Sequence, residues 1–212
     1  KQASVAPYIT LSGSFEEYIN KFDKKQRYNL RSRRKKLYEQ YDVKYVSCEP
    51  LQEQEGLKTL FDLHEKRAKR KNIASSFSRK DVIGFHNAFV PQIIKNGWLS
   101  FRFLKNENEV IAASYNFVFG GTVFSYQKGI DPEWEPYGPG TVLLYELIKE
   151  AFSKGYKEYD FLRGNEEYKN RWTQNHRMLY TAAIYNKTLR ANLLKIFSKS
   201  KDFIKRNLKC IN

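Results

Sequence analysis

Three strand-like runs that follow one another with almost no linker constrain the fold of this chain most. They are WLSFRFLK at 98–105, EVIAASYNFVFG at 109–120 and TVFSYQKGI at 122–130, and they are rich in aromatic and β-branched residues. The links between them, NEN and GG, are short enough for hairpins. The three runs are therefore predicted to be antiparallel neighbours in one sheet.

A glycine-rich turn and a helix follow the third run. The turn is EPYGPGT at 135–141, and the apolar spacing of TVLLYELIKEAFSKG at 141–155 predicts a helix that Gly155 ends. YKEYDFL at 156–162 predicts another strand, and a strand reached through a helix favours a parallel crossover. The predicted fold class is α/β, with a mixed, mostly antiparallel sheet flanked by helices.

The rest of the chain adds further elements. Helical periodicity runs from Ser14 to Gln40, where Ser14 and Glu17 form a capping box and a break is expected near Asp23. The other predicted elements are a strand at 42–49, helices at 55–71 and 79–95, a last strand at 178–186 and a basic amphipathic helix at 188–209.

The 212 residues suggest one domain, or at most two small ones. Residues 1–13 are interpreted as a linker or leader segment, 14–186 as the α/β domain and 187–212 as a basic C-terminal helix. Because the chain starts at Lys1 without a methionine, a fragment of a longer protein is expected.

The formal net charge of +15 favours an anionic partner. Cations crowd two segments, 24–36 and 66–71, and such runs are usually solvated faces. Phosphate-rich ligands, an anionic membrane surface and RNA remain alternatives, and Tyr28 and Tyr38 among the cations suit stacking on bases.

The cysteines and histidines point to no metal site. Cys48 and Cys210 lie far apart without ligand-like spacing, and the three histidines are scattered over separate elements. No run approaches the roughly 20 apolar residues that span a bilayer. A cytoplasmic location is expected, with peripheral contact to a membrane as an option.

The glycine turn has two interpretations. If a helix starts near Gly140, the unpaired amides at its start could hold a phosphate, with Gly138, Gly140, Thr141 and Val142 as donors. The other interpretation is an ordinary turn whose glycines are conformational, and the turn alone favours neither.

The order of meander, Gly-x-Gly turn, helix and parallel strand resembles the Gcn5-related N-acetyltransferase (GNAT) fold. In that family, acyl-coenzyme A rests on an Arg/Gln-x-x-Gly-x-Gly/Ala loop, and here Glu135 stands in the Arg/Gln place. YKNRW at 168–172 is similar to the Phe-Lys-x-x-Phe element of Fem-type aminoacyl transferases, and KKQRYNLRSRRKKL at 24–37 resembles the basic helix of the CelD-type branch. The resemblance covers roughly residues 14 to 185.

This resemblance implies an acyltransferase that moves an acyl group from acyl-coenzyme A, most simply acetyl-coenzyme A, to an amine or hydroxyl. A sugar or cell-envelope precursor is the expected acceptor, and relatives imply a companion N-terminal domain of the same fold. Two alternatives stay open: a Fem-like transferase that uses aminoacyl-tRNA, and a non-catalytic basic binding module. The residues implied in coenzyme binding are Tyr126, Gln127, Lys128, Tyr137, Gly138, Gly140, Thr141 and Val142.

Catalytic candidates lie in the predicted parallel strand and just past its end, where ligands gather in open α/β sheets. Asp160 is a candidate base, while Arg163 and Lys169 could neutralise a substrate phosphate or carboxylate. Tyr168 and Trp172 could line the substrate site. The alternatives are that Arg163 pairs with an acid, that Asp160 takes backbone or arginine hydrogen bonds, and that the two aromatic residues pack in the core.

Overall fold

The computed structural model describes residues 2–48, 53–75, 77–107, 109–182 and 184–188. Residues 5–177 form one compact unit, called the body below. Residues 1–4 and 178–212 form a second unit, and the expected C-terminal helix at 188–209 lies almost entirely outside the described residues.

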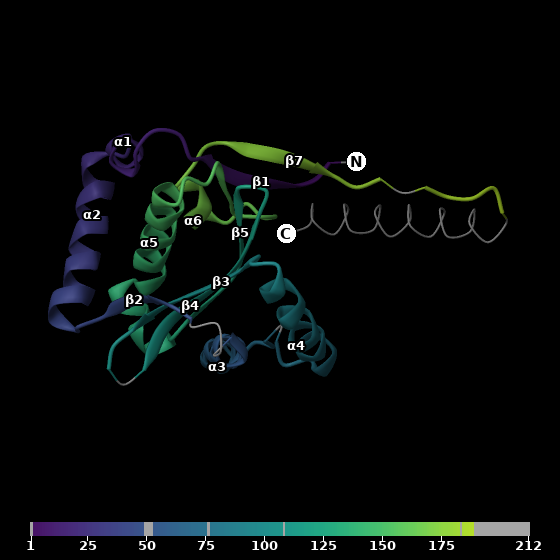
Figure 1. Cartoon of the computed structure of the whole chain (residues 1–212), viewed down its shortest axis with the longest axis horizontal. Coiled ribbons are helices and arrows are strands. Elements are labelled where there is room, and N and C mark those ends of the chain that lie inside the picture. The colour runs from purple at the N-terminus through teal and green to yellow at the C-terminus, as the bar shows by residue number, and fades with distance from the viewer. Residues whose placement is uncertain (1, 49–52, 76, 108, 183, 189–212) are drawn as a thin grey trace, which may run out of the picture. The chain divides into compact units, whose positions relative to one another are not determined.

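The sheet has the strand order β2-β3-β4-β5-β6-β1-β7. Figure 1 labels all of these strands except β6. β5 and β6 are parallel, whereas the pairs β2–β3, β3–β4, β4–β5 and β1–β6 are antiparallel. The predicted mixed, mostly antiparallel sheet, its meander and its parallel crossover are thus confirmed. The strands are β1 (Gln2–Thr10), β2 (Lys44–Ser47), β3 (Leu99–Lys105), β4 (Val110–Phe119), β5 (Thr122–Ile130), β6 (Glu158–Asp160) and β7 (His176–Tyr180).

Helices surround this sheet, and their starts follow local capping chemistry. The Ser14–Glu17 capping box is present at the first helix, and Asp23 caps the second by accepting a hydrogen bond from the Gln26 amide, so the expected break near Asp23 is confirmed. The helices are α1 (Phe15–Asn20), α2 (Lys24–Lys35), a π-helical turn η1 (Lys36–Gln40), α3 (Glu53–Lys71), α4 (Lys80–Lys95), a 3-10 helix η2 (Pro132–Tyr137), α5 (Pro139–Ser153) and α6 (Glu167–Asn170).

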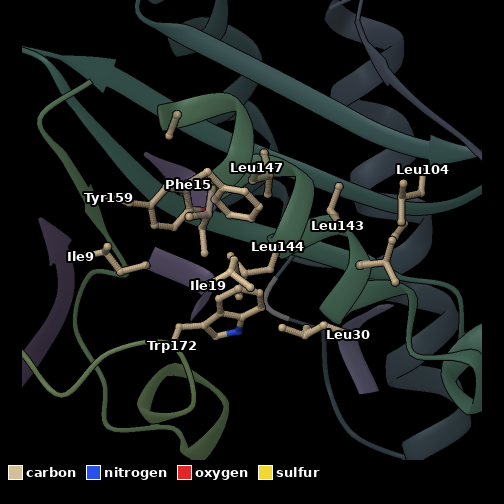
Figure 2. Close-up of a cluster of buried hydrophobic side chains, with 14 of the residues drawn as sticks. Ile9, Phe15, Ile19, Leu30, Leu104, Leu143, Leu144, Leu147, Tyr159 and Trp172 are labelled. Atoms are coloured by element: carbon tan, nitrogen blue, oxygen red, sulfur yellow. The ribbon is translucent and has the colours of Figure 1, made fainter. Parts of the chain in front are cut away.

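Two clusters of buried side chains lie on opposite faces of the sheet. Along β4, Ala112 belongs to the cluster under α1, α2 and α5, whereas the next residue, Ala113, belongs to the cluster under α3 and α4. Figure 2 shows the first cluster, in which Leu143 and Leu147 of α5 gather with Tyr159. Burial of each such leucine stabilises the fold by about 1.5–3 kcal/mol.

The structure has a strand of the sheet within residues 1–13, which were expected to be a linker or leader segment. They contain β1, in which Tyr8 lies opposite Asp160 and Ile9 lies opposite Tyr159. Ile9 and Ala6 are buried, whereas Pro7 interrupts the alternation that would mark a strand in the sequence. Pairing with a distant partner strand, rather than local propensity, orders this segment.

Two element boundaries also differ from expectation. The helix expected to start at Thr141 starts at Pro139, because proline is favoured in the first turn of a helix. The last strand is β7, which lies nearer the N-terminus than the expected 178–186. None of the helices in the described ranges has the length and apolar character needed to cross a membrane.

Candidate functional site

A groove opens where the sheet splays between β5 and β6. The two strands pair only from Thr122–Phe124 to Glu158–Asp160, while β5 continues to Ile130 in contact with β4. The groove has a volume of about 1700 Å³. Its walls come from β5, α2, the start of α5 and the connector at 161–175.

A β-bulge lies at the start of the splayed part of β5. Tyr115 pairs with Gln127 and Asn116 pairs with Ser125, so Tyr126 has no residue opposite it on β4. Bulges bend a strand and redirect its side chains, and they are frequent beside active sites. Here Tyr126, Gln127 and Lys128, all expected at a coenzyme site, line the groove.

The backbone of the glycine turn differs from the expected phosphate site. Gly138 has a left-handed conformation with φ +69°, and its carbonyl oxygen accepts hydrogen bonds from the amides of Thr141 at 3.0 Å and Val142 at 3.3 Å. The Gly138 amide donates to the Glu135 carbonyl at 3.0 Å. Three of the four expected donors are therefore used inside the turn, because η2 continues directly into α5. In the described part of the chain, only the Gly140 amide among the four has no recorded acceptor.

Gly140 is needed for packing. A Cβ atom at this position would overlap Cδ1 of Ile130 on β5. Gly140 was expected to lack a side chain so that a phosphate could approach. In the structure the glycine instead allows close contact between the start of α5 and β5. Gly140 and Thr141 nevertheless line the groove, so this contact fixes the turn at its edge.

A guanidinium group lies at the turn. Arg33 of α2 approaches Gly138 so closely that a Cβ atom there would be 3.1 Å from Nη1 of Arg33. The same Nη1 donates a hydrogen bond of 3.2 Å to Oγ1 of Thr141. Arg33 is exposed and lines the groove, so it supplies a positive charge where the expected amides do not.

Glu135, which replaces the family's Arg or Gln, faces a cation. Its Oε1 lies 3.7 Å from Nε of Arg67 on α3. Lys66 of α3 binds Asp131 at 2.7 Å, and Arg70 donates to the Pro132 carbonyl. The basic end of α3 therefore holds η2 in place and offsets the carboxylate of Glu135.

The connector after β6 contributes a buried lysine. Lys169 of α6 is 3% exposed, and its Nζ donates to the carbonyl of Arg163 at 3.0 Å and binds Oε2 of Glu166 at 2.8 Å. Those bonds hold the connector in a closed loop. Arg163 is exposed and lines the groove, and within the described residues it forms no ion pair with Asp160 or Glu166.

Lys128 lies in a different environment. Its Nζ donates to Oγ of Ser125 at 3.1 Å and lies 5.1 Å from the ring centroid of Tyr168, which also lines the groove. Burial and the charge of Lys169 lower the pKa of Lys128 to about 7, and Glu166 opposes this shift only in part. The amine is therefore partly uncharged near neutral pH.

Asp160 does not lie in the groove lining. Its Oδ1 accepts a hydrogen bond of 2.7 Å from the Leu162 amide, and its Oδ2 lies 3.0 Å from Nη1 of Arg177. Burial raises the pKa of this carboxyl group, although the Leu162 amide and Arg177 oppose the shift. Both carboxylate oxygens of Asp160 are engaged at the end of β6, outside the groove lining in which a base was expected.

Three other expected site residues pack against the protein. Val142 is buried, and Tyr137 packs against Tyr41 outside the groove lining. Trp172 borders the groove, but it is 6% exposed, packs against Phe22 and belongs to the core cluster in Figure 2. Their aromatic and apolar side chains therefore pack against other residues and support the part of the chain that lines the groove.

Of the three histidines, to which the sequence assigned no catalytic role, His64 lies in the groove lining and His86 contacts Tyr126, which also lines it. His64 lines the groove, and burial with the charge of Arg67 lowers its pKa to about 4. His86 lies between the hydroxyl groups of Tyr115 and Tyr126, at 3.4 and 3.5 Å. In the described ranges no three His, Cys, Asp or Glu residues are placed to hold a metal ion.

Charge in the groove is mainly positive. The acids that line it are Asp23, Glu135 and Glu166. The lysines and arginines that line it are Lys21, Lys25, Arg33, Arg67, Lys128, Arg163, Lys169 and Arg171. An anionic or phosphate-bearing ligand therefore suits it better than a cationic one.

Arg33 could have been selected from the sequence. It lies three residues after Leu30 and four before Leu37, which are both buried, so helical spacing puts it near the inward face of its helix. In the sequence it is one of the many cations of the segment 24–36. The position of Arg67 opposite Glu135 carries no comparable signal, because the two are far apart in sequence.

Comparison with known proteins gives matches to this fold. Residues 24–170 match the family model described as an acetyltransferase (GNAT) domain. The crystal structure of FemX aligns with a TM-score of 0.62 at 13% identity, covering 81% of this chain and 59% of that one. No curated protein matches the chain.

Two further solved structures have similar folds. The C-terminal domain (DUF2156) of a putative lysylphosphatidylglycerol synthetase from Agrobacterium fabrum aligns with a TM-score of 0.58 at 10% identity, covering 84% of this chain and 58% of that one. L-PGS from Bacillus licheniformis aligns with a TM-score of 0.59 at 14% identity, covering 92% of this chain and 64% of that one. The chain spans less than two thirds of the length of each of these three structures.

Proposed function

This chain belongs to the acetyltransferase (GNAT) domain family, and from that premise we propose that its groove transfers an acyl group from acyl-coenzyme A to an amine or hydroxyl acceptor. The observation that carries the proposal is the splay of β5 from β6. It leaves the segment from Ser125 to Ile130 without a β6 partner in the described structure, directly beside the turn at Gly138. Splayed strands expose backbone groups that can orient a thioester carbonyl.

Some of the groove residues suit the phosphate end of acyl-coenzyme A. The Arg33 guanidinium, the Thr141 hydroxyl and the Gly140 amide lie together at the turn and would hold the pyrophosphate. The coenzyme supplies an activated thioester. The chain's own residues bind its phosphates, orient the acyl carbon and accept a proton from the attacking group.

The acceptor site is proposed on the far side of the splay. Tyr168 is 40% exposed and, with Arg163, lines the part of the groove built by the connector. An aromatic face beside a guanidinium suits a ring that carries hydroxyl or acidic groups, such as a sugar derivative. A cell-envelope sugar precursor is therefore the acceptor class that we propose.

Calorimetry of the purified chain with acetyl-coenzyme A and with longer acyl forms tests the donor. Binding of a coenzyme thioester, followed by release of its thiol when amino sugars are added, is the expected result. Absence of both binding heat and a thermal shift with every donor would count against the proposal.

A second candidate donor is aminoacyl-tRNA. The wall of the groove that α2 forms carries Lys25 and Arg33, Lys21 lies just before it, and the turn amides are mostly used internally. Together with the Fem-type resemblance, this favours a polyanion larger than a coenzyme. Filter binding with charged tRNA across a salt series distinguishes the two donors, because tRNA affinity falls steeply with ionic strength. A response that is flat in salt would remove this candidate.

A further inference from the structure

Lys128 is a cation without a close counter-ion in a cationic groove. It lies on the splayed part of β5, and its recorded hydrogen bond goes to the uncharged Oγ of Ser125. Its Nζ lies above the rings of Tyr168 at 5.1 Å and Phe161 at 5.9 Å. In the described ranges, no carboxylate lies within 4.0 Å of this nitrogen.

The carboxylate that opposes the lowered pKa of Lys128, that of Glu166, is already paired with another lysine. Glu166 binds Nζ of Lys169 at 2.8 Å, and Lys169 in turn repels a charge on Lys128. The titratable groups around Lys128 are Glu166, just before α6, and Tyr168 and Lys169 on α6. This arrangement stabilises an uncharged amine that still faces the groove.

We propose that Lys128 is the proton acceptor for acyl transfer in this groove, which makes the inference depend on the proposed function. As the acceptor's nitrogen or oxygen bonds to the acyl carbon, its proton passes to the Lys128 amine, which becomes an ammonium. The bond from the acyl carbon to the carrier's sulfur then breaks, and the ammonium returns the proton to the departing thiolate. Atoms and charge balance without another reactant.

Other groups in or beside the groove are less suited to this role. Lys169 holds Glu166 and two backbone carbonyls, and the guanidinium of Arg163 has hydrogen-bond donors but no acceptor. His64 lines the groove as a neutral imidazole, but with a pKa of about 4 it is a weak base, whereas a base works best when its pKa lies near the working pH. The pKa of Lys128, about 7, meets that condition.

The first test needs no enzymatic activity. The chain is labelled with ¹³C-lysine, and the Cε shifts are followed by NMR from pH 5 to pH 11, with the Lys128 signal assigned by its loss in Lys128→Arg. A midpoint near 7 is expected. A midpoint in the usual lysine range, near 10.4, would overturn the proposal even if the protein catalyses acyl transfer.

The second test separates proton transfer from charge. Lys128→Arg replaces the titrating amine with a permanent cation that cannot accept a proton, so kcat should fall about 100-fold or more, and binding of acetyl-coenzyme A to the variant shows whether the groove is still formed. The wild-type rate should rise with pH up to about 7 and then level off, and the variant should lose this profile. Lys149→Met, on an exposed face of α5, is the matched control.

The outcomes separate the two proposals. Full turnover by Lys128→Arg with an unchanged pH profile overturns the role of Lys128 and leaves the transferase function intact. Failure of the wild type to bind or use any acyl donor overturns the function instead, and the NMR titration then shows whether Lys128 is an uncharged amine at neutral pH.

Discussion

Arg33 donates a hydrogen bond to the hydroxyl group of Thr141 from a position 108 residues earlier in the chain. This contact brings the basic helix α2 to the glycine turn at the start of α5. Most of the backbone N–H groups there donate to carbonyl oxygens of the turn, so under the proposed function the guanidinium of Arg33 would hold the donor phosphates in their place.

Replacing Arg33 should therefore weaken donor binding. A hydrogen bond to a charged group contributes about 1.5–3 kcal/mol, so Arg33→Ala is expected to raise the Kd for acetyl-coenzyme A about 10- to 100-fold. Calorimetry measures the change. Arg31→Ala removes an exposed cation of the same helix outside the groove lining and serves as the control. Equal loss in both variants would indicate an effect of general charge.

Gly140→Ala should destabilise the fold through contact with Ile130. The added methyl group overlaps Cδ1 of Ile130, and overpacking of this kind costs about 1–3 kcal/mol. Ile130→Val removes that Cδ1, so the double variant should regain most of the lost stability in urea unfolding. If the two substitutions are additive, the glycine is required for another reason.

Lys169→Met should mainly lower the stability of the fold and have a smaller effect on acyl transfer. The buried ammonium is bonded to the carbonyls of Leu162 and Arg163, and an unsatisfied buried carbonyl costs about 1–3 kcal/mol. A lower melting temperature is the expected readout, with Lys149→Met as the exposed control. A variant that melts like the wild type but cannot transfer an acyl group would show that Lys169 acts on the chemistry, either directly or through its charge beside Lys128.

Glu150 should make the fold sensitive to acid. Burial raises the pKa of Glu150, but hydrogen bonds from Arg102, Lys154 and Tyr45 outweigh it and hold the value at about 2, below the ordinary 4.5. A lowered carboxyl pKa gives stability that is present above pH 4.5 and is lost as the pH falls towards 2. Glu150→Gln should therefore cost about 2–3 kcal/mol at pH 7.

Denaturant unfolding of Glu150→Gln and the wild type at pH 7, 5, 4 and 3 checks this prediction. The difference between the two proteins should be constant down to about pH 5 and shrink below it. A difference that does not depend on pH would mean that shape, and not the charge of Glu150, matters at this position.

The sequence predicted most elements whose signals are local. The Ser14–Glu17 capping box, the Asp23 cap and the short links of the meander all depend on residues within a few positions of one another. β1 was missed because its order comes from pairing with β6, far along the chain, and Pro7 hides its alternation. Local strand propensity carries no information about a partner strand that lies so far away in the sequence.

The site was predictable in location but less so in its contacts. The splay beside the glycine turn follows from the order of elements, and Gly140, Thr141 and Lys128 do line the groove. The Gly138 carbonyl accepts hydrogen bonds from the Thr141 and Val142 amides because η2 runs directly into α5. The spacing of residues in the sequence does not predict this continuity. The burial of Lys128 likewise depends on α6 packing over it.

The pairing of Tyr8 with Asp160 joins strands from opposite ends of the body. Because such a pair closes a loop that contains nearly every other element, its entropy is unfavourable until those elements have assembled. The β1–β6 ladder is therefore a late step in folding. A molecule that halts before it leaves one side of β6 uncovered, where strands of other molecules can add and begin aggregation.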